Sequence, residues 1–169
     1  IWCKHTNYEQ ATRIPLLVAI PGVQAGARTS ALAETVDIYP TLCELAGVPA
    51  PAGLDGRSFA ATLRNPTAPT KDHAIQVYPR TGPNKTPLIG RAIRTARHRL
   101  VEWKKIGAPT ESAELELYDY ETDPLETKNI AAEQPAVVAE LRVLLARHPE
   151  AMPQITAAPA SPPAKDKPK

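Results

Sequence analysis

The sequence predicts an α/β fold, and three observations support this prediction. A continuous apolar run over residues 14–22, IPLLVAIPG, is typical of a strand buried on both faces of a sheet. The segment TVDIYPTLCELAGVP, residues 35–49, has helical spacing, and alternating runs between residues 89 and 119 indicate antiparallel strands. We therefore expect the end of a large parallel sheet, followed by a small antiparallel sheet with a C-terminal helix.

The expected helix within residues 35–49 has both a start and a stop signal. Asp37 is available as its N-cap, and Pro40 falls in the first turn, where a missing N–H costs nothing. Gly47 is the expected terminator. A strand followed by a helix is the repeating unit of an α/β layer.

The second half of the chain is predicted to form a smaller body. A connection rich in Pro, Gly, Asp and Asn precedes it, with one short helix at 58–63 and one short strand at 74–78. The last expected element is a helix over 135–147, which begins with Pro135. Its apolar face, expected to pack on the small sheet, consists of Val137, Leu141, Leu144 and Leu145.

These elements predict three parts. Residues 1–66 are the last part of a larger α/β domain, and residues 67–150 are a small C-terminal subdomain. Residues 151–169 are rich in Pro, Ala and Lys with almost nothing to bury, which predicts a disordered tail.

Composition argues against several classes of function. The net charge of the 169 residues is only +2, with little sign segregation, which argues against a nucleic-acid partner. No apolar run approaches the roughly 20 residues of a membrane-spanning helix. The two cysteines, Cys3 and Cys43, have no spacing that would hold zinc, so no metal ligand is assigned within the chain.

A cluster of polar donors precedes the expected strand. Lys4 and His5 are followed by Thr6 and Asn7, and loops beside strand ends are where α/β proteins place their sites. A lysine ammonium there can neutralise the oxygens of a sulfate or phosphate group, although a solvated surface lysine is the alternative. His5 can donate a proton to a leaving oxygen, contact the anion, or only order the loop.

A pair of charged residues follows this cluster. Glu9 and Arg13 are four residues apart, so they can pair within a turn of helix. Because such spacing is usually structural, we assign both residues to holding the loop rather than to catalysis.

Three blocks of the sequence together match one family pattern. They are KHTNYEQATRIPLLVAIPG (residues 4–22), VDIYPTLCELAGVPAPAGLDGRS (36–58) and LYDYETDPLETKNIA (117–131). In this order they resemble the type I sulfatases of the alkaline phosphatase superfamily. The resemblance implies the C-terminal part of an alkaline-phosphatase-like sulfatase fold, with Lys4 matching the lysine that contacts the sulfate group. His5 is carried over beside it as a second catalytic candidate.

Two shorter segments resemble the iduronate-2-sulfatase-like branch of that family, whose members act on sulfated sugars. They are QVYPR (residues 76–80) and IGRAIRTARHRLVEW (89–103). Arg80, Arg91 and Arg94 are therefore candidates for binding a carboxylated or sulfated saccharide, because a guanidinium binds such groups bidentately. Solvated cations on an exposed sheet are the alternative.

The resemblance implies a sulfuric ester hydrolase with calcium and a formylglycine nucleophile made from the Cys of a Cys-x-Pro-x-Arg motif. That motif does not occur in this sequence, because Cys3 precedes Lys-His-Thr and Cys43 precedes Glu-Leu-Ala. The calcium ligands are also expected outside the chain. We therefore expect a fragment that begins within a motif and is inactive alone, and a complete protein exported to the periplasm, the lysosome or the cell exterior.

Two other functions remain open at this point. A phosphodiesterase or phosphonate hydrolase of the same superfamily would use a lysine and a metal equally well. A non-catalytic binding or structural module that shares only ancestry is the second alternative. The expected partner is a sulfated small molecule or saccharide, and the sequence predicts no oligomeric state.

Overall fold

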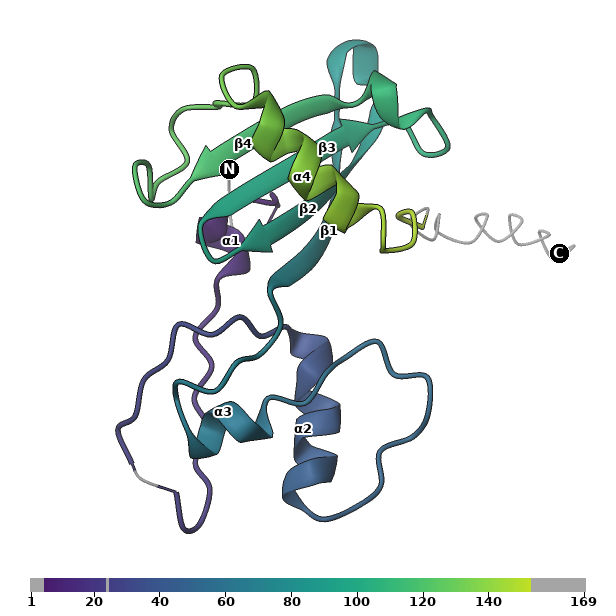
Figure 1. Cartoon of the computed structure of the whole chain (residues 1–169). Helices are drawn as coiled ribbons and strands as arrows, with labels where there is room; N and C mark the ends of the chain where they lie inside the picture. Colours follow the sequence, from purple (N-terminus) through teal and green to yellow (C-terminus); the bar gives the residue numbers. More distant parts are fainter. Residues whose placement is uncertain (1–4, 24, 153–169) are drawn as a thin grey trace, which may run out of the picture.

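The computed structural model describes residues 5–23 and 25–152. The helices are α1 (Glu9–Thr12), α2 (Ile38–Leu45), α3 (Ala60–Arg64) and α4 (Pro135–Leu145), with 3₁₀ turns η1 (Thr35–Asp37), η2 (Pro83–Lys85) and η3 (Thr110–Ser112). The strands are β1 (His73–Thr81), β2 (Pro87–Thr95), β3 (His98–Lys104) and β4 (Glu114–Asp119). Figure 1 shows a sheet body with α1 and α4, beside a smaller body with α2, α3 and long loops.

The four strands form an antiparallel sheet in the order β1-β2-β3-β4. Ile93 of β2 pairs with Leu100 of β3, and Leu100 pairs with Leu117 of β4. These three side chains therefore lie in one row on the same face of the sheet. The predicted small antiparallel sheet is confirmed, and the short strand expected at 74–78 is the middle of β1.

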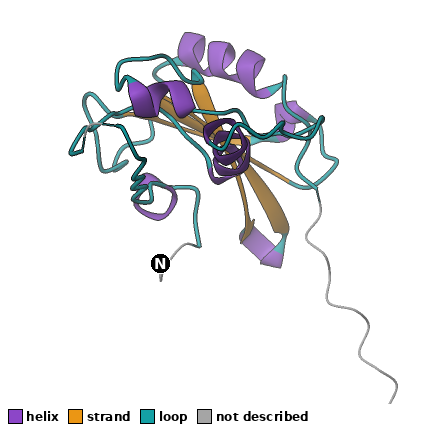
Figure 2. Cartoon of the chain, turned by 90° about the horizontal axis from the view of Figure 1, so that it is seen from below, coloured by secondary structure: helices purple, strands orange, loops and turns teal. Residues whose placement is uncertain are grey.

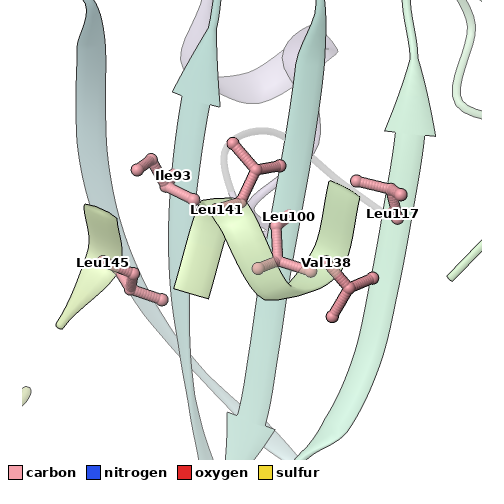
Figure 3. Close-up of a cluster of buried hydrophobic side chains, with 6 residues drawn as sticks. All are labelled: Ile93, Leu100, Leu117, Val138, Leu141 and Leu145. Atoms are coloured by element: carbon pink, nitrogen blue, oxygen red, sulfur yellow. The ribbon is translucent and has the colours of Figure 1, made fainter. Parts of the chain in front are cut away.

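Helix α4 covers one face of this sheet, as Figures 1 and 2 show. The predicted helix over 135–147 is confirmed over Pro135–Leu145. The buried core between helix and sheet consists of Ile93, Leu100, Leu117, Val138, Leu141 and Leu145 (Figure 3). Each such side chain contributes about 1.5–3 kcal/mol when fully buried, so this cluster dominates the stability of the sheet body.

Helix α2 confirms the helix expected within residues 35–49. Gly47 ends it with φ +66°, and the Val48 N–H donates to the Cys43 carbonyl at 2.9 Å, which closes the last turn. Asp37 stands at the N-cap position, but its carboxylate accepts from the backbone N–H groups of Glu34 and Arg57, each at 2.7 Å. Asp37 therefore joins two loops instead of capping its own helix.

A partly buried ion cluster connects α2 to the sheet body. Lys71 Nζ lies 2.7 Å from the Asp37 carboxylate and 2.5 Å from that of Glu34, and Glu34 also accepts from the Ile75 N–H of β1 at 2.9 Å. Burial opposes the charge of Lys71, but the hydrogen bonds that its ammonium donates to Asp37 and Glu34, and the charges of these carboxylates, outweigh burial and raise the pKa of the lysine.

The strand expected over residues 14–22 does not form within this chain. Residues 14–20 carry no strand, and Leu17 is 89% exposed. A buried strand needs hydrogen-bonding neighbours, and every strand of the described chain belongs to the small sheet. The predicted α/β fold class still holds, with helices α2 and α3 beside the sheet body (Figure 1).

Several predictions concern residues outside the described ranges. Lys4 and Cys3 precede His5, the first described residue, and most of the predicted tail over 151–169 follows Met152. Within the described residues, Cys43 is a free and buried thiol, and no helix is long and apolar enough to cross a membrane.

Candidate functional site

The segment that follows Lys4 lies on the face of the sheet opposite α4. Gln76 of β1 donates from Nε2 to the Thr6 carbonyl at 3.3 Å, and the buried Asn7 donates from Nδ2 to the Gly90 carbonyl of β2 at 3.2 Å. Two neighbouring strands therefore hold consecutive residues of this segment. A loop held in this way can present its side chains in a fixed position.

Gly90 is required for this close approach. A Cβ atom at this position would lie 2.5 Å from Asn7 Nδ2 and 2.5 Å from a ring carbon of Trp103. The φ angle of Gly90 is not in the left-handed region, so the requirement is steric rather than conformational. The missing side chain lets the segment sit directly on the sheet.

His5 is the first described residue of the segment, and it contacts β1. Its Nδ1 atom is hydrogen-bonded to the hydroxyl of Tyr78, and the two rings meet edge to face with centroids 5.8 Å apart. The His5 side chain is otherwise exposed to solvent. The predicted anion-contacting histidine is thus accessible and has one specific partner on the sheet.

Arg99 of β3 fixes the next residues through a buried guanidinium that is only 1% exposed. It donates to the Asn7 carbonyl at 2.6 Å, to Glu9 Oε2 at 2.6 Å and to Thr12 Oγ1 at 3.0 Å. It also lies 2.8 Å from the buried carboxylate of Glu126. A buried guanidinium with this many partners holds the segment across a sequence separation of about 90 residues.

Glu9 completes this network from the side of the segment. Its two carboxylate oxygens accept from Arg94 at 3.0 and 3.1 Å, and its backbone N–H donates to Glu126 Oε2 at 2.7 Å at the start of α1. Burial alone would raise the pKa of Glu9, but hydrogen bonds and charge from Arg94 and Arg99 hold it below its ordinary value. The expected partner Arg13 lies 4.0 Å away and is largely exposed, so Glu9 holds the loop chiefly through the sheet.

The three candidate saccharide-binding arginines do not converge. Arg80 pairs with Glu114 and Glu116 and stacks over the Trp103 ring, 4.1 Å from its centroid. Arg94 pairs with Glu9, as described, and stacks over Tyr120 at 3.7 Å.

Arg91 lies on the opposite face, where it is buried beneath the end of α4. It donates to the carbonyls of Leu145 at 2.7 Å and His148 at 3.2 Å, and it pairs with Glu150 at 2.8 Å. Each of the three guanidinium groups already has partners in the chain, and their binding of a saccharide stays a prediction.

Sequence reasoning did not find Tyr78, Arg99 or Glu126. Arg99 shares its face of β3 with the buried Val101 and Trp103, and its guanidinium contacts Asn7, Glu9 and Thr12 of the segment. Glu126 has φ +56°, which is uncommon for a residue other than glycine, and the sequence around it does not predict its contact with the segment. Only the fold brings these residues to the segment.

Comparisons with known proteins cover this same stretch. The family model described as N-sulphoglucosamine sulphohydrolase, C-terminal, matches residues 1–150. The chain is 32% identical over 143 residues to Arylsulfatase K of Danio rerio, covering 84% of this chain and 27% of that protein. It is 31% identical over 139 residues to a sulfatase of Formosa agariphila, covering 79% of this chain and 25% of that protein.

Solved structures are similar as well. The structure of BT4656 in complex with its substrate D-glucosamine-2-N,6-O-disulfate matches with a TM-score of 0.62 and 28% identity, covering 74% of this chain and 25% of that chain. BT1596, a 2-O GAG sulfatase, matches with a TM-score of 0.50 and 33% identity, and the match covers 66% of this chain and 23% of that chain. The chain spans about a quarter of the length of the curated relatives it matches. The chain therefore belongs to the N-sulphoglucosamine sulphohydrolase C-terminal family, and its relatives are sulfatases.

Proposed function

We propose that the complete protein containing this chain is a sulfatase that removes sulfate from a sulfated sugar. The observation that carries this proposal is the family match over residues 1–150, which includes Lys4, His5 and the four-stranded sheet. Two structural relatives are described with a disulfated glucosamine substrate and as a 2-O GAG sulfatase, which supports a sulfated sugar as the substrate class.

The proposed roles follow from the chemistry of the two side chains. Lys4 neutralises the sulfate oxygens as negative charge builds on them in the transition state. His5 donates a proton to the sugar oxygen that leaves. The contacts of Thr6, Asn7 and Glu9 to the sheet support a fixed position for His5.

We propose that calcium and the nucleophile come from parts of the protein outside this chain. The described residues contain no group of three His, Cys, Asp or Glu side chains that could hold a metal ion. We also expect this chain alone to hydrolyse no sulfate ester.

The finer assignment is to the iduronate-2-sulfatase-like branch. It is supported by residues 76–80 and 89–103, which lie in β1, β2 and β3. If Arg80 or Arg94 binds a saccharide anion, the ligand has to compete with Glu114 or with Glu9 for the guanidinium.

The test is an assay of the complete protein on a sulfated glucosamine and on a matched phosphate ester. We expect release of sulfate from the sugar and little release of phosphate. Phosphate release without sulfate release would favour the phosphodiesterase or phosphonate hydrolase. No turnover of either ester by a folded, metal-loaded protein would favour the non-catalytic module.

A further inference from the structure

We propose that Tyr78 is a positioning residue for His5, and that its hydroxyl oxygen accepts the Nδ1–H of the imidazole so that Nε2 is the atom that exchanges the proton. This inference rests on the proposed function, because it assigns His5 its chemistry. It concerns a residue of β1 that contributes nothing to the hydrophobic core beneath α4.

The contact itself is specific. The Tyr78 hydroxyl is hydrogen-bonded to Nδ1 of His5, which is 73 residues away in sequence. The rings meet edge to face, with an interplanar angle of 70°. Among the described residues, Nε2 of His5 has no hydrogen-bond partner, so it is the ring nitrogen available to a ligand.

The backbone around Tyr78 makes this contact rigid. Tyr78 pairs with Gly90, and Gly90 pairs with Trp103, so the three residues form one row across β1, β2 and β3. The Gly90 carbonyl accepts the hydrogen bond from Asn7. Tyr78 therefore contacts the His5 ring, and its neighbour Gly90 in the same row contacts the side chain of Asn7. These two contacts restrict the position of the imidazole relative to the segment.

The direction of the hydrogen bond decides the chemistry. A neutral imidazole carries one hydrogen, and the partner of one nitrogen selects which nitrogen keeps it. If Tyr78 accepts from Nδ1–H, Nδ1 keeps its hydrogen in both charge states. Nε2 then gains and loses the proton, and among the described residues it is the ring nitrogen of His5 without a hydrogen-bond partner.

The proton balance of the step is simple. As the nucleophile, which we propose lies outside this chain, forms its bond to sulfur, the bond between sulfur and the sugar oxygen breaks and its electron pair goes to that oxygen. The imidazolium gives its Nε2 proton to the same oxygen. The ring is left neutral, with its remaining hydrogen on Nδ1 and bonded to the Tyr78 oxygen. The tyrosine neither gains nor loses a proton.

A double-mutant cycle in the complete protein tests the positioning role. We expect Tyr78→Phe to lower kcat about tenfold with little change in KM, since the phenyl ring keeps the packing and only the hydroxyl is lost. In a His5→Ala background the same substitution should have no further effect, because the two residues act as one unit. Tyr39→Phe, at an exposed tyrosine of α2, is the matched control and should change nothing.

The outcomes are distinct. An equal loss of kcat from Tyr78→Phe in the presence and absence of His5 would overturn the inference and leave the sulfatase function standing. If His5→Ala itself leaves turnover unchanged, the proposed catalytic role of His5 falls and the Tyr78 inference falls with it.

A second measurement does not depend on activity. The ¹⁵N chemical shifts of the His5 ring, assigned with the His5→Ala variant, report which nitrogen carries the hydrogen in the neutral form. We expect the hydrogen on Nδ1 in the complete protein and a shift toward the Nε2–H form in Tyr78→Phe. A neutral ring with its hydrogen on Nε2 in both proteins would overturn the inference, whether or not the protein hydrolyses sulfate esters.

Discussion

The sheet body and the smaller body treat their apolar residues in opposite ways. Leu100 and Leu117 are fully buried beneath α4, whereas Leu17 of the extended segment and Leu42 of α2 are 89% and 57% exposed. Ile14, Leu16 and Val18 beside Leu17 are exposed as well, and a large contiguous apolar patch is rarely left uncovered on a monomeric protein. The sheet body is thus stabilised by its own core, while we expect the surface around residues 14–18 to be covered in the complete protein.

The polar contacts differ in the same way. The sheet body buries a connected set of charges around Arg99, and most of its members have several partners. Apart from the Lys71 cluster that joins the two bodies, the smaller body contributes an exposed pair between Arg64 and Glu44 at 3.4 Å. We therefore expect the same type of substitution to lower the free energy of unfolding more in the sheet body than in the smaller body.

The largest difference in stability between the two bodies is expected when one arginine of each is substituted. Arg99→Met removes the partner that the buried Glu126 carboxylate shares with the partly buried Glu9, and breaking a buried pair of this kind costs about 3–5 kcal/mol of unfolding free energy. Arg64→Met removes an exposed pair worth about 0–1 kcal/mol. Urea unfolding of both variants measures the difference, and equal midpoints would contradict the contrast between the two bodies.

The second difference is expected for leucine. Leu100→Ala opens a cavity beneath α4 and should cost about 2–5 kcal/mol. Leu17→Ala should change the stability of this chain by less than about 0.5 kcal/mol, because the side chain is already in water. In the complete protein, however, Leu17→Ala should become destabilising if this surface is covered there. A Leu17→Ala variant that is neutral in both contexts would show that the segment stays exposed.

A smaller effect is expected for Glu9→Gln, which weakens the charged hydrogen bonds to Arg94 and Arg99 by about 1.5–3 kcal/mol. The pKa of Glu9 is held below its ordinary value, so its contribution is present above about pH 4.3, the unfolded pKa, and is lost as the pH falls through the folded value. The free energy of unfolding, measured across this acid range, should therefore depend less steeply on pH in Glu9→Gln than in the unsubstituted protein. An unchanged pH dependence would show that the Glu9 carboxylate does not stabilise the fold through its bonds to Arg94 and Arg99.

The smallest effect is expected at the contact of His73 and His148, whose Nε2 atoms lie 2.6 Å apart. Burial and the neighbouring His73 lower the pKa of His148, so the folded state favours the neutral ring. Stability should fall slightly as the pH drops below about 6.5, where the unfolded chain takes up the proton. His148→Gln should reduce this dependence of Tm on pH. If the dependence is as large in His148→Gln as in the unsubstituted protein, another titratable group causes it.

Local patterns predicted the sheet body well. The alternating runs of β2, β3 and β4 and the apolar face of α4 are properties of short segments, and their burial follows from packing within the chain. The helix stop at Gly47 is local too. The apolar run over 14–22 has the composition of a buried strand, but a strand needs neighbours that this chain does not supply.

The candidate site could be predicted only in part. Lys4 and His5 belong to one short motif, which suggested them as site residues, and this assignment stays a prediction. The residues that contact the segment could not be predicted, because Tyr78, Arg99 and Glu126 meet it across sequence separations of 73 to 117 residues. Only the sheet register and the close approach at Gly90 reveal these contacts.

The central proposal is that Lys4 binds the sulfate group of the substrate, beside the segment that begins at His5 and is held by the sheet body. Its most direct test is the turnover of a sulfate ester by the complete protein with Lys4→Ala, beside Lys128→Ala as an exposed control. We predict that Lys4→Ala lowers kcat by about 100-fold or more, as expected for loss of a group that stabilises transition-state charge, while Lys128→Ala has no effect. Unchanged turnover in a correctly folded Lys4→Ala protein would contradict the account.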